Sequence, residues 1–285
     1  MRKNQSSLTA AGIAIARAVE SEKPADERIC YDPYARQFVP AWMYRILGFF
    51  IKIGYAELRG PGVNGFLMAR ERYIDDVLQN FLNEGLQQLV ILGAGYDSRS
   101  YRFNLPGQVK TFEVDLPATQ ADKLEKVQRV FGKIPDHVTY LPVDFNTQTL
   151  SERLLSSGYD PGLISLFIWQ GVTMYLTPAG VDSTLAFIMK NTAPGSAIIF
   201  DYVYQAVLDG IQKQSEISSI RRYRFMTGEG LTFGIAEGTA EAFLKVRGFQ
   251  QANDVTADEL KAAYFTGKNA SRKVVGGYGI VIGEV

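Results

Sequence analysis

The chain has 285 residues, with 30 Lys and Arg against 30 Asp and Glu, and it contains one cysteine and one histidine. Hydrophobic residues make up 46% and charged residues 21%, which is typical of a folded globular protein and excludes intrinsic disorder. The zero net charge argues against a nucleic-acid-binding protein, and Cys30 and His137 allow no disulfide framework and leave almost no ligands for zinc.

Residues 1–84 are expected to form a helical N-terminal extension. Its first apolar residues, from Leu8 to Val19, recur at helical spacing, which predicts a short amphipathic helix rather than a signal peptide. Several aromatic residues of this region are expected to pack in the core or the cap, with a dimer contact as the alternative: Trp42, Phe49, Phe50 and Tyr55.

From residue 85 onward short apolar runs alternate with helical patterns, which predicts βαβ units. The expected strands are Gln88–Leu92, Lys110–Val114, Val138–Pro142, Leu163–Ile168, Ala197–Asp201, one around Phe249, and Tyr278–Gly283. The expected helices between them include Ala118–Phe131, Thr177–Thr192 and Gly238–Arg247. The fold class is therefore α/β, a doubly wound, mostly parallel, seven-stranded Rossmann-like sheet at residues 85–285.

The uncharged stretch 161–181 is long enough to span a bilayer, but prolines and glycines interrupt it. Its apolar part has the length of a strand, which predicts a buried strand followed by a turn and a helix. The protein is therefore expected to be cytoplasmic, without a membrane partner.

Residues 202–235 are longer than an ordinary connection, so they are predicted to form an inserted lid. Tyr202 directly follows the predicted strand end and is the candidate for contact with a substrate. The lid carries aromatic and basic residues that either enclose an anionic or aromatic acceptor or form an amphipathic helix with a solvated basic face: Tyr202, Tyr204, Arg221, Arg222, Tyr223, Arg224 and Phe225.

A glycine-rich turn is the strongest local pattern. The predicted strand Gln88–Leu92 leads directly into Gly93-Ala94-Gly95, where glycine allows a sharp turn and the close approach of a ligand. Asp115 ends the next strand about 20 residues later, where nucleotide-binding sheets place an acid against ribose hydroxyls. A tight turn without a ligand is the simpler alternative, and Asp115 argues against it.

Two cofactor classes fit this turn. A nicotinamide dinucleotide favours a third glycine, but Ser98 stands at that position. S-adenosylmethionine has no phosphate and needs acids or amides at successive strand ends, which Asp115, Asp144 and Gln170 supply. Each of these side chains could instead cap a helix or complete a turn.

Six motifs in order resemble the leucine carboxyl methyltransferase family, in particular its bacterial branch of S-adenosylmethionine-dependent methyltransferases. They are Asp32–Ala35, Ala69–Asp76, Leu92–Arg99, Glu113–Pro117, Val143–Phe145 and Gly171–Leu176. The resemblance runs from about residue 10 to the C-terminus. It implies a class I methyltransferase fold with S-adenosyl-L-methionine as the cofactor.

The resemblance also implies roles for individual residues. Arg70 matches the arginine that pairs with the methionine carboxylate of the cofactor. Three further groups match the cofactor loop, the ribose site and the adenine site: Gly93, Ala94 and Gly95; Asp115 with Leu116; Asp144 with Phe145. Eukaryotic relatives use a lysine near their N-terminus; Arg17 and Lys23 are both candidates for its counterpart here, and neither aligns securely.

Gln170 departs from the family, because many relatives carry glutamate there. Glutamine keeps an acceptor but lacks the negative charge near the cofactor's ammonium and sulfonium groups. The substitution is expected to weaken cofactor affinity or to change its pH dependence.

The expected function is O-methylation of a carboxylate or hydroxyl of a small molecule. His137 is predicted to be an ordinary surface residue, so no histidine base is expected. The alternatives are a cofactor-binding protein without methyl turnover and an NAD(P)-dependent oxidoreductase. The second is disfavoured because Ser98 stands at the position of the third glycine. The sequence leaves the oligomeric state open.

Overall fold

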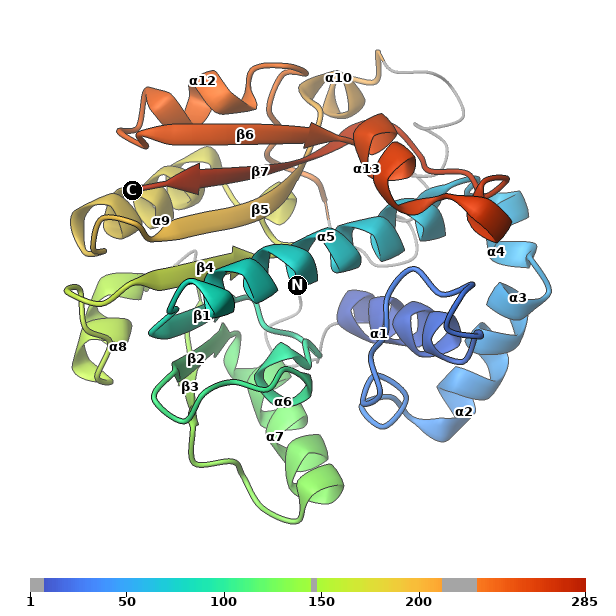
Figure 1. Ribbon diagram of the computed structural model, residues 1–285, viewed down its shortest axis with the longest axis horizontal. Helices are drawn as coiled ribbons and strands as arrows, with labels where there is room; N and C mark the ends of the chain where they lie inside the picture. The colour runs from blue at the N-terminus through green and yellow to red at the C-terminus, as the bar shows by residue number, and fades with distance from the viewer. Residues whose placement is uncertain (1–7, 145–147, 212–229) are drawn as a thin grey trace.

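The structure is a computed structural model that describes residues 8–144, 148–211 and 230–285, built around one seven-stranded sheet (Figure 1). The strand order is β3-β2-β1-β4-β5-β7-β6, and β7 runs antiparallel to the other six strands. The strands are β1 Gln88–Leu92, β2 Lys110–Asp115, β3 Val138–Pro142, β4 Ser165–Trp169, β5 Ala197–Val203, β6 Gln251–Thr256 and β7 Tyr278–Glu284. The predicted doubly wound, mostly parallel sheet is confirmed, although the sixth strand begins after Phe249.

Helices cover both faces of the sheet (Figure 1). One face packs against α8 (Leu150–Ser156), α9 (Pro178–Lys190) and α12 (Ala240–Lys245), and the other against α5 (Val63–Asn83) and α13 (Ala257–Tyr264). In β5, Ile198 and Phe200 face the first set of helices and Ile199 faces the second. Burial on both faces explains why the central strands appear in the sequence as continuous apolar runs.

Helices also predominate among the described residues that precede β1, although 22–40 form a loop. They are α1 Leu8–Ser21, α2 Ala41–Met43, the π-helix η1 Tyr44–Gly48, α3 Phe49–Lys52, α4 Tyr55–Arg59 and α5. A third apolar core lies between α1 and α7 (Pro117–Phe131) and includes Ile15, Phe38 and Val127. The division of the chain at residue 84 remains a prediction, and α5 shares its core with the strands that follow.

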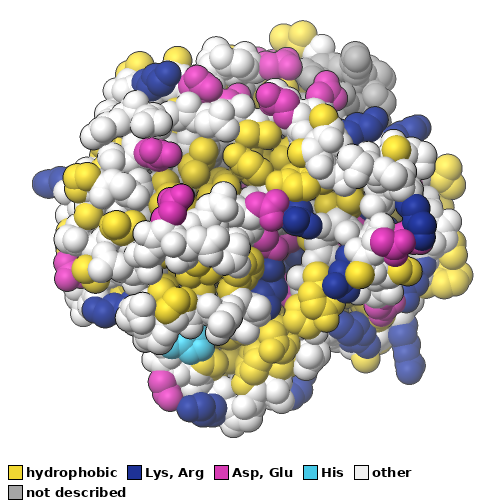
Figure 2. Space-filling view, viewed as in Figure 1, with side chains coloured by type: hydrophobic (Ala, Val, Ile, Leu, Met, Phe, Trp, Pro, Cys, Tyr) yellow, Lys and Arg dark blue, Asp and Glu magenta, His cyan; other side chains and the backbone are white. Residues whose placement is uncertain are grey.

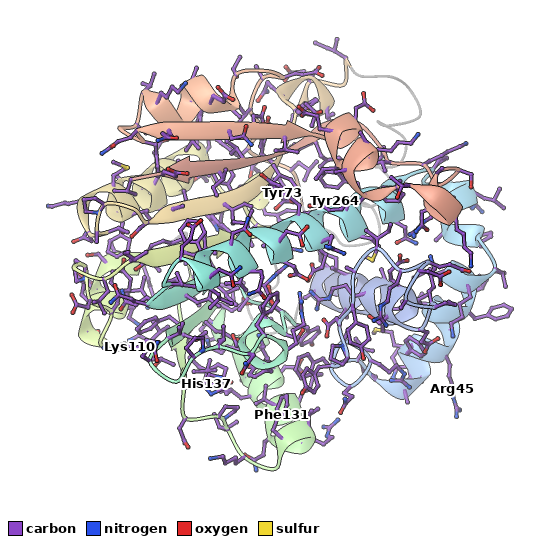
Figure 3. The ribbon with its side chains drawn as sticks, in the orientation of Figure 1. Arg45, Tyr73, Lys110, Phe131, His137 and Tyr264 are labelled. Carbon is purple, nitrogen blue, oxygen red and sulfur yellow. The ribbon has the colours of Figure 1, made fainter. Side chains whose placement is uncertain are left out.

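The expectation that the aromatic residues of the extension pack inside is wrong. Trp42 is 62% exposed and Phe49 57%, and Phe50 and Tyr55 are also exposed. The segment buries Tyr44 in the core around α1, so the rings on the other side of these short helices face outward. Arg45 likewise extends from this edge of the molecule (Figure 3).

His137 lies at the surface, in the loop before β3 (Figures 2 and 3). Its Nε2 is 2.9 Å from the carbonyl oxygen of Ser100. Cys30 is buried and free. Within the described ranges, no helix combines the length and the apolar character that crossing a membrane requires.

Candidate functional site

The glycine turn after β1 is tied to β2. The backbone N–H groups of Gly93 and Ala94 donate to the carbonyl of Val114, over 2.7 and 3.0 Å. Gly93 has a φ of +67°, and a Cβ there would lie 2.3 Å from Cγ2 of Val172. Both the backbone conformation and the close neighbour therefore require glycine at position 93.

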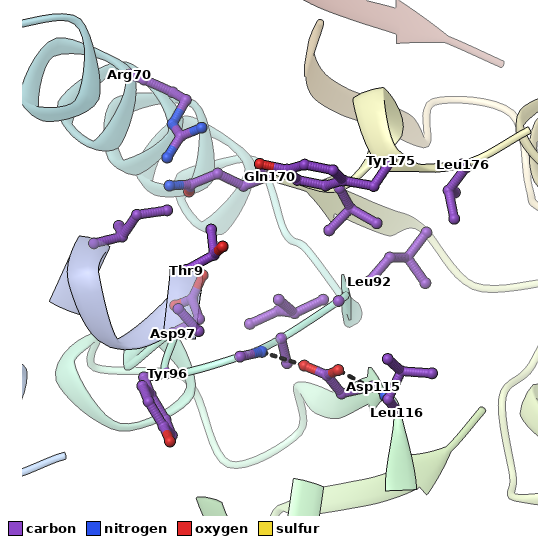
Figure 4. Close-up of a pocket in the computed structure, with 18 of the residues that line it drawn as sticks. Thr9, Arg70, Leu92, Tyr96, Asp97, Asp115, Leu116, Gln170, Tyr175 and Leu176 are labelled. Atoms are coloured by element: carbon purple, nitrogen blue, oxygen red, sulfur yellow. Dashed lines mark hydrogen bonds between the residues drawn. The ribbon is translucent and has the colours of Figure 1, made fainter. Parts of the chain in front are cut away.

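Asp115 ends β2 beside this turn (Figure 4). One carboxylate oxygen accepts a hydrogen bond from the N–H of Gly95, and the other accepts one from the N–H of Leu116 over 2.6 Å. Burial raises the pKa of Asp115 to about 6, although the two backbone donors oppose that shift. The site therefore holds a carboxylate that titrates near neutral pH.

Arg70 extends from α5 toward the same place (Figure 4). Its Nη1 pairs with Asp201 of β5, whose other oxygen accepts a hydrogen bond from the N–H of Gly171. Within the described chain, Nε and Nη2 of Arg70 are buried without a hydrogen-bond partner. Buried donors are normally satisfied, so this guanidinium edge suits a carboxylate ligand.

These groups meet in one cavity of about 250 Å³ at the carboxyl ends of the parallel strands. It is lined by eight of the residues expected at a cofactor site: Arg70, Gly93, Ala94, Gly95, Asp115, Leu116, Asp144 and Gln170. Phe145 lies outside the described residues, as does the part of the predicted lid at 212–229.

The structure also brings Arg17 to the cavity, through the α1 helix. Its Nε lies 3.1 Å from Asp32, and its Nη1 lies 3.3 Å from Glu71. Lys23, the other basic candidate, pairs with Glu20 and lines a different cavity. The sequence did not separate the two, but Arg17, on α1, lines the candidate cavity, whereas Lys23, which follows that helix, does not.

Further lining residues were not expected from the sequence. They are Thr9, Ala10, Ile13, Ile91, Leu92, Tyr96, Asp97, Val172, Tyr175, Leu176 and Gly230. Asp97 and Tyr175 stand inside motifs that carry the family resemblance, which was the available signal. The α1 residues gave no such signal, because they are distant in sequence from every strand end.

The model of the family described as leucine carboxyl methyltransferase matches residues 10–189. The chain belongs to this family. A Bacillus subtilis relative named "Putative S-adenosyl-L-methionine-dependent methyltransferase YktD" is 27% identical over 94% of both chains. A relative of the same description from Mycobacterium sp. (strain JLS) is 29% identical over 88% of this chain and 86% of its own.

Solved structures support the fold. A DUF574 family protein from Streptomyces avermitilis is 13% identical, with a TM-score of 0.59 over 98% of both chains. A "putative methyltransferase" from Thermobifida fusca is 14% identical, with a TM-score of 0.56 over 99% of this chain and 96% of its own. The family expected from the motifs is therefore confirmed, and so is the class I methyltransferase fold.

Tyr202 does not lie where the sequence placed it. β5 continues to Val203, so Tyr202 lies within the strand, and strand alternation turns its side chain away from the face of Asp201. Its ring is fully buried, and its hydroxyl lies 2.8 and 2.9 Å from the two carboxylate oxygens of Asp254 on β6. Tyr202 does not line the cavity, which corrects its expected contact with a substrate.

Tyr202→Phe is therefore expected to lower stability and to leave ligand binding unchanged. Loss of the hydroxyl leaves Asp254 with one hydrogen bond fewer, at a cost of about 1–2 kcal/mol in the free energy of unfolding. Thermal unfolding measures that cost, and calorimetric titration of S-adenosylmethionine measures binding. Tyr264→Phe, which removes a hydroxyl that donates to Asp76, is the matched control. Weaker binding by Tyr202→Phe, with unchanged binding by Tyr264→Phe, would show that Tyr202 contributes to the ligand site.

Gln170 lines the cavity, and two buried charged side chains outside the cavity lining bind its amide. Its Nε2 donates to Glu71 over 2.7 Å, and its Oε1 accepts from Arg99 over 2.9 Å. Both ends of the amide are thus oriented by buried charges.

Proposed function

We propose that this protein is an S-adenosylmethionine-dependent O-methyltransferase that acts on a carboxylate or hydroxyl of a small molecule. One observation carries the proposal: a buried guanidinium edge with no partner among the described residues, a glycine turn and a strand-end carboxylate face one cavity in a chain of the leucine carboxyl methyltransferase family. The names of the relatives supply the cofactor, S-adenosyl-L-methionine.

The residues present fit this cofactor. Nε and Nη2 of Arg70 would receive its carboxylate, since a guanidinium pairs well with that group. The glycine turn leaves space for the chain of the cofactor, and Asp115 would accept hydrogen bonds from its ribose hydroxyls. Asp144, at the end of the neighbouring strand, would accept from the adenine amine.

The charge of the cavity also favours a cationic cofactor. Its described lining contains two arginines, Arg17 and Arg70, and three carboxylates, Asp97, Asp115 and Asp144. A sulfonium and an ammonium are attracted to this excess of carboxylates, whereas a pyrophosphate is repelled. The helix after the turn, α6 (Arg99–Arg102), has four residues, and its first arginine is engaged by buried acids. These features leave the NAD(P)-dependent alternative without support.

When bound, the cofactor would supply an activated methyl group for an acceptor oxygen, with the electron pair of the broken carbon–sulfur bond remaining on sulfur. The chain orients and encloses the two reactants, since proximity and alignment carry most of such a reaction. The described lining includes no histidine, lysine or cysteine. This composition suits an acceptor that is already ionised, such as a carboxylate, better than one that needs a strong base.

Transfer of labelled methyl from S-adenosylmethionine to a panel of small carboxylic acids and phenols tests this proposal. Label that alkaline hydrolysis releases as methanol marks a methyl ester, whereas label that stays marks an ether. Arg70→Lys is the control for cofactor dependence. Tight cofactor binding without transfer to any acceptor would favour a binding protein without methyl turnover.

Cofactor affinity is expected to fall as the pH drops below about 6. The folded-state pKa of Asp115 is about 6, and ribose hydroxyls donate to its ionised form, so binding is full above pH 7 and is lost as Asp115 takes up a proton. The loss approaches about tenfold per pH unit below pH 6. Calorimetric titration between pH 5 and 8 measures it. Asp115→Asn should bind weakly with a flat profile, and a pH-independent affinity in the unsubstituted protein would contradict the role of Asp115.

A further inference from the structure

A buried ionic cluster lies directly beneath the proposed cofactor site. It joins α1, the loop that follows it, α5, the turn after β1, and α6, and its members are Arg17, Asp32, Glu71, Asp75, Asp97, Arg99 and Arg102. Three guanidinium groups thus face four carboxylates, so the cluster carries one net negative charge. The side chains are at most 12% exposed.

Glu71 is at the centre of this cluster. Its Oε1 lies 3.3 Å from Arg17 and 3.1 Å from both Arg99 and Arg102. Burial alone would raise the pKa of Glu71, but the three arginines, Arg99 first, hold it well below its usual range. Glu71 therefore stays ionised throughout the physiological pH range.

Gln170 is the link between Glu71 and the cavity. It donates from Nε2 to the second oxygen of Glu71 and accepts at Oε1 from Arg99. A neutral amide satisfies both neighbours, because it offers a donor to the carboxylate and an acceptor to the guanidinium. A glutamate at position 170 would instead place a second carboxylate 2.7 Å from Glu71, and two such groups cannot both remain ionised.

We propose that Glu71 supplies, through Gln170, the negative charge that the family resemblance assigns to position 170, and that Gln170 is neutral because Glu71 is charged. Glu71 is then a positioning residue, which acts on the cavity through Gln170 and Arg99. The glutamine is a compensated substitution, so it does not mark a degraded cofactor site. This inference rests on the proposed function, since the charge is assigned to the recognition of a cationic cofactor.

The opposite account makes the opposite prediction for Gln170→Glu. If glutamine were a weakened version of the family's glutamate, Gln170→Glu would restore charge and bind S-adenosylmethionine more tightly than the unsubstituted protein. If Glu71 already supplies the charge, the same substitution adds a second buried carboxylate and weakens binding. Gln170→Ala, which removes the amide without adding charge, is the matched control.

The test is calorimetric titration of all three proteins with S-adenosylmethionine and S-adenosylhomocysteine at pH 8, with thermal unfolding in parallel. We expect affinity to fall about threefold to tenfold in Gln170→Ala, and at least about 30-fold in Gln170→Glu. The unfolding temperatures should fall in the same order. Equal or tighter binding by Gln170→Glu than by the unsubstituted protein would overturn the inference.

A pH series provides a readout that loss of packing would not move. In Gln170→Glu the close carboxylates share a proton, so a folded-state pKa is raised, and the stability it contributes is present at low pH and lost as the pH rises. The unfolding temperature of this variant should therefore approach that of the unsubstituted protein near pH 5.5 and separate from it by pH 8.5. If the unfolding temperature of Gln170→Glu stays below that of the unsubstituted protein by the same amount at every pH, the pairing with Glu71 is contradicted.

The double variant Glu71→Gln/Gln170→Glu exchanges the two charges and should bind more tightly than Gln170→Glu. A folded double variant that binds no better would count against the coupling. If the double variant does not fold, the relative affinities of Gln170→Ala and Gln170→Glu still decide the question. If the unsubstituted protein binds neither cofactor form, the proposed function fails and so does the cofactor role of Glu71. The pH series would then still test the contact between Glu71 and Gln170.

Discussion

Arg70→Ala is expected to weaken S-adenosylmethionine binding by at least about 100-fold, which corresponds to the loss of roughly 3 kcal/mol from charge-assisted hydrogen bonds. The reason is geometric: within the described chain, Nε and Nη2 of Arg70 have no hydrogen-bond partner, whereas Nη1 is held by Asp201. Those two donors are the groups that a cofactor carboxylate would engage. Calorimetric titration measures the change in affinity.

Two controls separate binding from stability. Arg70→Lys keeps a positive charge beside Asp201 but loses the planar pair of donors. It should therefore fold, and its affinity for S-adenosylmethionine should be at least about tenfold lower. Arg72→Ala lies on the same helix, removes an exposed ion pair with Asp76, and should change neither property appreciably. Retained affinity in a folded Arg70→Ala protein would remove Arg70 from the site.

Gly93→Ala is expected to destabilise the protein by about 3 kcal/mol or more and to abolish tight cofactor binding. A side chain at φ +67° costs roughly 1–2 kcal/mol, and the added Cβ would lie 2.3 Å from Val172, so the turn must move. That turn carries the Gly95 N–H that holds Asp115. Thermal or denaturant unfolding gives the stability, and titration gives the affinity.

Gly132→Ala is the matched control for backbone strain. Gly132 has a φ of +76° at the end of α7, but a Cβ there meets nothing within 4 Å. It should cost about 1 kcal/mol and leave cofactor affinity unchanged. Equal losses of stability in the two variants would show that crowding by Val172 contributes nothing.

The alternation of apolar runs and helical patterns was sufficient to predict the sheet. The central strands are buried on both faces, so each appears in the sequence as a short hydrophobic block, and the predicted range of β1 agrees with the structure. Of the two edge strands, β3 was predicted with its exact bounds, whereas β6 was not. β6 is partly exposed and contains Asn253 and Asp254, so its pattern does not resemble that of a buried strand.

The candidate site could be predicted where its residues follow strands. Asp115, Asp144 and Gln170 all stand at carboxyl ends, and a parallel sheet brings such ends together. Arg17 and Asp201 could not be placed in this way. The first depends on how α1 docks against the sheet, and the second acts from within β5, where sequence periodicity does not show which buried acid holds Arg70.

Tyr202 was misplaced for a related reason. A strand end predicted two residues early turned a buried core residue into a candidate for the substrate site. Gln170 shows a further limit, since its role depends on Glu71, which is 99 residues away in the chain. The sequence showed a departure from the family, whereas the contact with Glu71 gives a physical reason for it.

Calorimetric titration of the purified protein with S-adenosylmethionine, S-adenosylhomocysteine and NADH tests the central claim most directly. The account predicts one-site binding of the first two ligands and no binding of NADH. A folded protein that binds neither S-adenosylmethionine nor S-adenosylhomocysteine, or that binds NADH instead, would contradict it.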